Sequence, residues 1–213
     1  MKTEIIPAII AKNQDELNAA INKVKDFAEV IQLDFMYGKF VDNHSIDFDF
    51  SLPDSKCAFE AHLMIKNPLG WIKKNYSKVD TILIHFESYD DKNEILKAIL
   101  LAKEKKKKAG IVINPETKVE DIKKYLEMID QILVMTVNPG FYGSPFLEET
   151  LKKCEEIRRL APKIQIEVDG GITDLTIRKA AKAGANLFVS GSYILKAENP
   201  KAAFLNLKNL ILT

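Results

Sequence analysis

The chain has 213 residues, 46% of them hydrophobic, which is enough for one large domain or two small ones and excludes disordered and fibrous classes. Its 31 Lys and Arg nearly balance its 30 Asp and Glu, and the net charge of +1 gives no global field favouring nucleic acid or a membrane surface. The two cysteines form no CxxC motif and the first ten residues are too short for an apolar leader, so we expect a reduced, cytoplasmic protein.

Short apolar runs rich in Val, Ile and Leu alternate with charged stretches of helical spacing along the whole chain. The near-continuous apolar character of the runs is typical of parallel strands that helices cover. The predicted strands are residues 4–10, 30–35, 58–64, 81–86, 110–114, 131–135, 164–168 and 187–190. The predicted helices are residues 13–27, 68–76, 92–107, 118–128, 146–160, 174–183 and 200–210.

This alternation, which no Pro-, Gly- or Ser-rich linker divides, predicts a single α/β domain over residues 1–213, folded as a (β/α)8 TIM barrel. The alternative is a doubly wound open sheet, but residues 7–12 lack the glycines of its usual nucleotide turn. Residues 43–56 contain a proline and alternate apolar with polar residues, so the second crossover is expected to be irregular. The lysine-rich run at 103–108 is expected to be a solvated helix end rather than a nucleic-acid site.

Polar residues gather at the predicted carboxyl ends of the strands, where (β/α)8 barrels carry their reacting groups. These strand-end residues are Asp34, His62, His85, Glu87, Asn114, Met135 to Asn138, Asp169 and Ser190 to Ser192. Asp34 and Asp169 lie on strands far apart around the ring, so their carboxylates can approach a ligand from opposite sides. That arrangement suits removal of a proton from one face of a carbon and delivery to the other. The alternative for each aspartate is an N-cap or loop hydrogen bond.

Glycine-bearing loops follow the last three strands: NPGFYGSPF at 138–146, Gly170 with Gly171, and Gly191 with Ser192. Glycine lets backbone N–H groups approach an anion, and the loops after strands seven and eight commonly bind phosphate in such barrels. Plain turn geometry is the alternative. The sequence contains neither GxxxxGK[ST] nor GxGxxG, which argues against a nucleoside triphosphate or a dinucleotide.

These motifs, in this order and over nearly the whole chain, resemble those of the ribulose-phosphate 3-epimerase family. The matching segments are LDFMYGKFVDN (33–43), AHLMIKNP (61–68), HFE (85–87), INPET (113–117), MTVNPGFYGSPF (135–146), EVDGGI (167–172) and GS (191–192). The resemblance implies a barrel of the ribulose-phosphate-binding type that interconverts D-ribulose 5-phosphate and D-xylulose 5-phosphate. It also implies a divalent metal ion (Zn, Fe, Mn or Co), two catalytic aspartates and a homo-oligomer.

Carried onto this chain, the resemblance makes Asp34 and Asp169 the acid/base pair and also metal ligands, with His62 as a further ligand. It implies that three methionines surround the reacting carbon and that the glycine-bearing loops hold the phosphate. These residues are Met36, Met64 and Met135 for the carbon, and Gly140, Gly143, Ser144, Gly170, Gly171, Gly191 and Ser192 for the phosphate. His85 and Glu87 are secondary candidates for the site.

The chain departs from the family pattern at its expected site. Gln32 stands in place of a metal-binding histidine, so a weaker amide-oxygen donor is expected there. Tyr37 replaces an acidic residue, and Ala8 replaces a serine. Ser144 and Pro145 stand where the family commonly has a glutamine followed by a variable residue. The alternatives are therefore a non-catalytic sugar-phosphate-binding paralogue and an epimerase of another phosphorylated ketose, such as a hexulose 6-phosphate. In every case the expected partner is a phosphorylated sugar, and not nucleic acid or a membrane.

Overall fold

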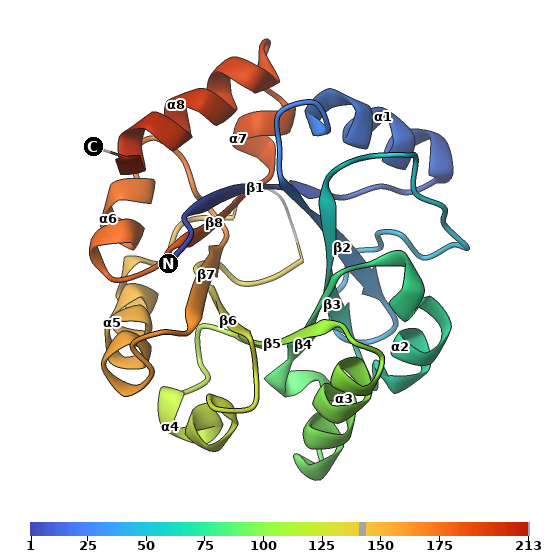
Figure 1. Cartoon of the computed structure of the whole chain (residues 1–213), viewed down its shortest axis with the longest axis vertical. Coiled ribbons are helices and arrows are strands. Elements are labelled where there is room, and N and C mark those ends of the chain that lie inside the picture. Colours follow the sequence, from blue (N-terminus) through green and yellow to red (C-terminus); the bar gives the residue numbers. More distant parts are fainter. Residues whose placement is uncertain (141–143, 213) are drawn as a thin grey trace.

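The computed structural model describes residues 1–140 and 144–212. Eight parallel strands follow one another around a closed barrel, and β8 pairs with β1 to complete the ring (Figure 1). They are β1 (Glu4–Ile9), β2 (Val30–Tyr37), β3 (Ala58–Ile65), β4 (Thr81–His85), β5 (Lys108–Ile113), β6 (Gln131–Met135), β7 (Gln165–Asp169) and β8 (Leu187–Ser190). The predicted (β/α)8 barrel is confirmed, and each strand boundary lies within two residues of its prediction.

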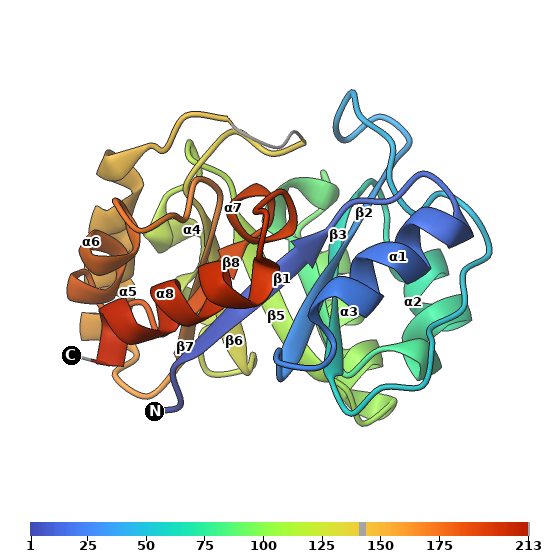
Figure 2. The same cartoon turned by 90° about the horizontal axis from the view of Figure 1, so that it is seen from above.

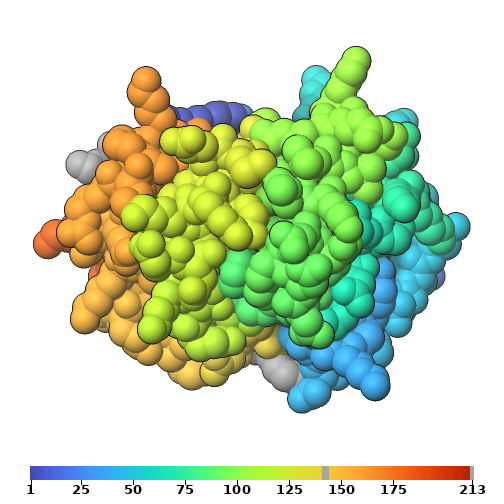
Figure 3. Space-filling model, turned by 90° about the horizontal axis from the view of Figure 1, so that it is seen from below, coloured from blue at the N-terminus to red at the C-terminus, as the bar shows by residue number. Residues whose placement is uncertain are grey.

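Helices form an outer ring around the strands (Figures 1 and 2). They are α1 (Gln14–Val24), α2 (Leu69–Asn75), α3 (Asn93–Glu104), α4 (Val119–Ile122), α5 (Leu151–Leu160), α6 (Ile177–Lys182), α7 (Ser192–Leu195) and α8 (Pro200–Leu212). The segments of α3, α4 and α5, from green to orange, lie side by side and cover one side of the molecule (Figure 3). Helix α7 was not predicted, because four residues are too few to show a helical period.

Six of the seven predicted helices are shorter than predicted, and α4 and α5 differ most from their predictions. The prediction at 118–128 becomes α4 followed by a 3-10 turn at Lys123–Tyr125. The prediction at 146–160 becomes a 3-10 turn at Glu148–Thr150 followed by α5. The backbone N–H of Leu147 donates to the Thr136 carbonyl at 2.7 Å, so the chain is tied to the end of β6 before α5 can begin.

The barrel has an outer and an inner core, which follow from the two-residue period of the strands. The outer core contains strand residues such as Ile82 and Ile84 together with helix residues such as Ile95 and Ile99. Alternate strand residues form two smaller clusters without helix residues, which places them inside the barrel. These clusters are Leu83, Val112, Leu133, Met135 and Val137, and Ile6, Ala8, Leu187 and Val189.

The second crossover lacks a helix, as predicted: all of residues 38–57 are described and none is helical. Its backbone is held by an isolated bridge between Met36 and Ser45, and the Ser45 hydroxyl accepts from the N–H of Ala11 at 3.0 Å. Farther along, the Phe50 ring packs on Phe35 with centroids 5.2 Å apart. The segment therefore covers β2 with irregular backbone, and its first part rises beside the barrel mouth (Figure 2).

A buried polar layer lies within the barrel, below the site described in the next subsection. Gln131 donates to Glu167 at 2.6 Å and to Glu60 at 3.4 Å, and these three side chains are at most 5% exposed. Burial raises the pKa of Glu60 to about 7 and raises the pKa of Glu167 well above its ordinary value. The hydrogen bond between the two carboxyl groups allows them to share a proton.

This layer predicts a pH-dependent term in the stability of the protein. Because folding raises the pKa of Glu60 from 4.5 to about 7, its contribution is fully present below pH 4.5 and is lost as the pH rises to 7. We expect Glu60→Gln to remove this loss and to raise the melting temperature at pH 8 by at least about 2 °C. Thermal denaturation at pH 5 and pH 8 gives the melting temperatures, and Glu120→Gln, at an exposed residue, is the control. Equal changes of melting temperature between the two pH values in wild type and Glu60→Gln would contradict the prediction.

The lysine-rich run lies at the end of α3, as predicted. Lys103 pairs with Asp130 at 2.9 Å and Lys105 with Glu104 at 2.9 Å. Separately, no helix of the described residues combines the length and the apolar character that crossing a bilayer requires.

Candidate active site

A cavity of about 310 Å³ opens at the carboxyl ends of the strands. The predicted site residues that line it are Asp34, Met36, His62, Met64, Met135, Gly140, Ser144, Asp169, Gly170, Gly171, Gly191 and Ser192. Gln32, His85 and Glu87 are not in the lining, and they connect to it through hydrogen bonds. Gly143 lies outside the described residues.

Strand register brings the polar and methionine side chains of the site together. Asp34 of β2 stands opposite His62 of β3, and Met36 stands opposite Met64 two residues farther along both strands. On the other side of the barrel, Met135 of β6 stands opposite Asp169 of β7. Because side chains two residues apart share a face, Met36 and Met64 lie above Asp34 and His62, whereas Met135 lies level with Asp169.

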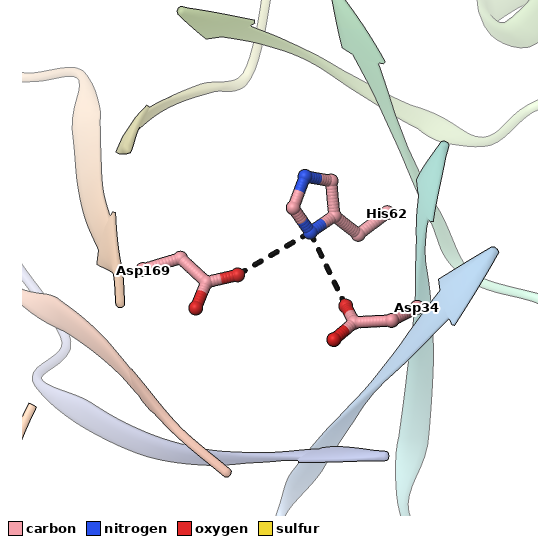
Figure 4. Close-up of side chains that lie close together, drawn as sticks. All are labelled: Asp34, His62 and Asp169. Atoms are coloured by element: carbon pink, nitrogen blue, oxygen red, sulfur yellow. Dashed lines mark hydrogen bonds and ion pairs between the residues drawn. The ribbon is translucent and has the colours of Figure 1, made fainter. Parts of the chain in front are cut away.

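Asp34, His62 and Asp169 form a compact triangle. The Nδ1 atom of His62 lies 3.2 Å from Asp34 Oδ1 and 3.3 Å from Asp169 Oδ2. The two aspartates approach this nitrogen from different sides, one from β2 and the other from β7 (Figure 4). The opposed carboxylates expected from the sequence therefore meet across the barrel axis.

For both Asp34 and His62, burial and the neighbouring opposite charges shift the pKa in opposite directions. Burial raises the pKa of Asp34, and the hydrogen bond and charge of His62 offset part of that effect. Burial disfavours the charged form of His62, but its hydrogen bonds to Asp169 and Asp34 and their charges outweigh it and raise the pKa of His62 to about 9. The imidazole is therefore cationic at neutral pH when it is surrounded only by protein groups.

Gln32 places its amide nitrogen at the centre of the triangle. Its Nε2 donates to Asp34 Oδ1 at 2.8 Å and to Asp169 Oδ2 at 2.8 Å, and it lies 3.2 Å from His62 Nδ1. The sequence led us to expect the amide oxygen to face the site. The nitrogen faces it instead, because two carboxylates side by side require donors. Gln32 Oε1 is buried and has no hydrogen-bond partner among the described residues.

The triangle fits a divalent cation. One donor atom each from Asp34, His62 and Asp169 lies within 4.8 Å of the others, and two oxygens with one imidazole nitrogen suit a transition metal or zinc. The unpartnered Oε1 of Gln32 gives a second indication. Rotation of the amide would turn this oxygen toward the centre, at the cost of both hydrogen bonds that the nitrogen makes.

Methionines and glycines from the strand ends and the loops after them also line the cavity. Met36, Met64 and Met135 are at most 3% exposed. Gly171 has φ +65°, a left-handed conformation that favours glycine. Gly170 has φ +113°, and a Cβ there would overlap the side chain of Val137. These two glycines allow the chain to turn sharply directly after Asp169.

The sequence analysis placed Thr136 among the strand-end residues but gave it no role, and this residue fixes the loop after β7. Its hydroxyl lies 2.9 Å from the Asp169 carbonyl and 2.6 Å from the Gly170 carbonyl. Thr176 donates to the Gly171 carbonyl at 2.7 Å, and Ser190 donates to the Ile172 carbonyl at 2.8 Å. The only available signal was a hydroxyl residue next to an apolar strand, which is too common to single out.

Comparison with solved structures supports the fold. The chain aligns with a ligand complex of KGPDC from Streptococcus mutans at a TM-score of 0.72 and 17% identity, covering 99% of this chain and 97% of that one. It aligns with a 3-hexulose-6-phosphate synthase at a TM-score of 0.66 and 17% identity, covering 98% and 99%. At these identities the likeness concerns the barrel alone.

Sequence comparison identifies the family. The chain is 36% identical to ribulose-phosphate 3-epimerase of Aquifex aeolicus over 198 residues, covering 89% of this chain and 88% of that protein. It is 33% identical to ribulose-phosphate 3-epimerase of Bacillus subtilis over 216 residues, covering 96% and 98%. Residues 4–195 match the model of the ribulose-phosphate 3 epimerase family. Because this match spans all eight strands and the cavity they enclose, the chain belongs to the ribulose-phosphate 3 epimerase family.

Proposed function

We propose that the protein is a ketose-phosphate 3-epimerase that interconverts D-ribulose 5-phosphate and D-xylulose 5-phosphate. The observation that carries this proposal is the pair of carboxylates, Asp34 and Asp169, which meet across one cavity from β2 and β7. Epimerisation needs a group on each face of the carbon, and family membership supports C3 of a ketose phosphate as this carbon.

The proposed reaction begins with removal of the C3 proton, which the neighbouring ketone acidifies. One carboxylate accepts this proton, and the other carboxyl group delivers a proton to the opposite face of the planar enediolate. Burial, which raises the pKa of Asp34, favours a carboxyl group that holds a proton at that position. The methionines surround the planar intermediate with an apolar, deformable wall that excludes water.

Asp34, His62 and Asp169 are the residues that we propose hold a divalent metal ion, with Gln32 as a weak fourth ligand. A bound metal ion would supply positive charge that stabilises the negative oxygens of the enediolate. His62 has to give up its Nδ1 proton for that nitrogen to act as a ligand.

We further propose that the phosphate group lies at the end of the cavity formed by Gly170, Gly171, Gly191 and Ser192. The carbonyls of residues 169–172 are held by the hydroxyls of Thr136, Thr176 and Ser190, which fixes the course of this loop. Backbone N–H groups in a fixed loop can bind a dianion without a lysine or arginine side chain.

Substitution of Gly191 tests the phosphate position. Gly191 has φ −88° and ψ −84°, so it avoids the left-handed region that favours glycine, although this ψ lies beyond the α region. We expect Gly191→Val to lower ribulose 5-phosphate affinity roughly tenfold or more, because hydrogen bonds to a charged group are lost, while the melting temperature changes little. Calorimetry on wild type and variant measures it. Unphosphorylated ribulose binding as tightly as ribulose 5-phosphate would contradict the proposal.

The proposed activity is tested by isotope exchange in deuterated water. The protein is incubated with ribulose 5-phosphate, with and without added divalent metal, and deuterium at C3 of both pentulose phosphates is followed by NMR. Deuterium at C3 with formation of xylulose 5-phosphate is the expected result. Binding without exchange under both conditions would favour the sugar-phosphate-binding paralogue, and faster exchange in a hexulose 6-phosphate would favour the other ketose.

The two cysteines agree with the proposed cytoplasmic location. Cys57 and Cys154 are both buried and form no disulfide, as a protein of a reducing compartment requires. Burial raises the pKa of the Cys154 thiol to about 12, so this thiol is unreactive at neutral pH.

A further inference from the structure

A hydrogen-bonded chain of three side chains leads away from the triangle, behind the cavity wall. His62 Nε2 lies 2.8 Å from His85 Nε2, and the two rings stack with centroids 5.0 Å apart. His85 Nδ1 lies 3.3 Å from Glu87 Oε2. Both histidines are fully buried, so each ring nitrogen must find its partner within the protein.

Glu87, at the far end of this chain, is held by two donors from the segment after β5. Its Oε1 accepts from the backbone N–H of Asn114 at 3.0 Å and from the hydroxyl of Thr117. Burial disfavours its charge, but His85, Thr117 and Asn114 outweigh this and keep the pKa of Glu87 below its usual value. Glu87 is therefore ionised and can only accept hydrogen bonds.

An acceptor at one end determines the direction of every hydrogen bond in the chain. His85 Nδ1 faces the carboxylate and must carry a proton. A neutral imidazole carries one proton, so with that proton on Nδ1 the Nε2 of His85 is a bare acceptor 2.8 Å from His62 Nε2. His62 Nε2 must then donate to it, which leaves His62 Nδ1 as the nitrogen whose proton can be replaced by another cation.

We propose that Glu87 is a positioning residue that, through His85, keeps a proton on His62 Nε2 and so directs Nδ1 of His62 toward Asp34 and Asp169 as a ligand. The inference deepens the proposed function, because it assumes that His62 is a metal ligand. A ligating histidine usually donates its second N–H to a carboxylate or carbonyl. Here the second N–H of His62 donates to His85, and His85 in turn donates to the carboxylate of Glu87, which follows the next strand, β4.

Glu87→Gln reverses the direction of the chain while preserving its shape. The backbone N–H of Asn114 can only donate, so the amide oxygen of Gln has to face it. The amide NH2 then faces His85 Nδ1, which becomes an acceptor, and the His85 proton moves to Nε2. That proton meets the one on His62 Nε2, so His62 has to lose its Nε2 proton and keep only the proton on Nδ1, where the metal would bind.

The test has a spectroscopic readout and a binding readout, neither of which needs substrate. Histidine 15N NMR of the metal-free protein gives the protonated nitrogen of each ring, and titration with Co2+ gives metal affinity. We expect Nδ1–H alone on His85 and protons on both nitrogens of His62 in wild type, but Nε2–H on His85 and Nδ1–H alone on His62 in Glu87→Gln. We expect the Co2+ affinity of Glu87→Gln to fall by about 10- to 100-fold.

Matched variants separate a change in hydrogen-bond direction from a general loosening of the Glu87 side chain. Thr117→Val removes one donor to Glu87 but leaves the carboxylate as an acceptor, and Glu87→Asp shortens the side chain but keeps it acceptor-only. Both are expected to keep the wild-type proton positions, and Thr117→Val to keep Co2+ affinity within about threefold. Glu94→Gln, at an exposed ion pair with Lys97, is the control for a carboxylate-to-amide change elsewhere.

Several results would overturn the proposal. They are Nε2–H on His85 in wild type, unchanged proton positions in Glu87→Gln, and equal losses of Co2+ affinity in Glu87→Gln and Thr117→Val. If Glu87→Gln does not fold, the proton positions of wild type and Glu87→Asp still decide the question. Absence of isotope exchange at C3 with the expected proton positions would refute the proposed activity and leave this inference standing.

Discussion

Asp34→Asn and Asp169→Asn are each expected to reduce epimerisation of ribulose 5-phosphate by about 100- to 10,000-fold, because each removes the proton-transferring group on one face of C3. Each variant should still fold, because Asn is nearly isosteric with Asp and keeps one oxygen toward Gln32 or His62. Steady-state conversion to xylulose 5-phosphate measures the loss, and circular dichroism measures the fold.

Isotope exchange makes this prediction sharper than a loss of activity. With one carboxylate left, a variant can exchange the C3 proton of the epimer that presents its proton to that carboxylate, without converting it to the other epimer. We expect Asp34→Asn and Asp169→Asn to retain such exchange, if at all, with opposite epimers. Asp47→Asn, at an exposed residue that pairs with His44, is the matched control. Near-normal epimerisation by either active-site variant would show that the two-carboxylate assignment is wrong.

Gln32→His is expected to strengthen divalent metal binding by at least about tenfold. The physical reason lies in the orientation of the amide. In wild type a metal ion has to replace the two hydrogen bonds of 2.8 Å that Nε2 makes to Asp34 and Asp169, and it gains only an amide oxygen. An imidazole removes this competition and contributes a nitrogen ligand. Titration with Co2+ gives the affinity, and the absorption spectrum of bound Co2+ reports the change of ligand.

Gln32→Leu separates the two parts of this expectation, because it removes the competing N–H donors without adding a ligand. Its metal affinity is expected to lie below that of Gln32→His. Equal affinities of wild type and Gln32→His would contradict the view that Gln32 weakens the site. Equal affinities of Gln32→Leu and Gln32→His would show that only the loss of the competing hydrogen bonds matters.

The sequence was sufficient for the barrel and for the positions of the site residues along it. Apolar runs mark strands such as β4 and β6 because both faces of these strands are covered, and the segments between them mark the crossovers. Once the strands are placed, Asp34, His62 and Asp169 fall at or near their carboxyl ends. Helix lengths were less predictable, since the start of α5, for example, is limited by the hydrogen bond from the Leu147 N–H to the Thr136 carbonyl at the end of β6.

Only the tertiary structure decided how the side chains of the site contact one another. Gln32 could be singled out from the sequence, but the orientation of its amide depends on two carboxylates, one of them 137 residues away. The direction of the chain from Glu87 to His62 likewise depends on Asn114 and Thr117, which follow another strand. Local periodicity determines which face of a strand a residue occupies. Hydrogen-bond direction in a buried site is determined by donors and acceptors from several strands, which only closure of the barrel brings together.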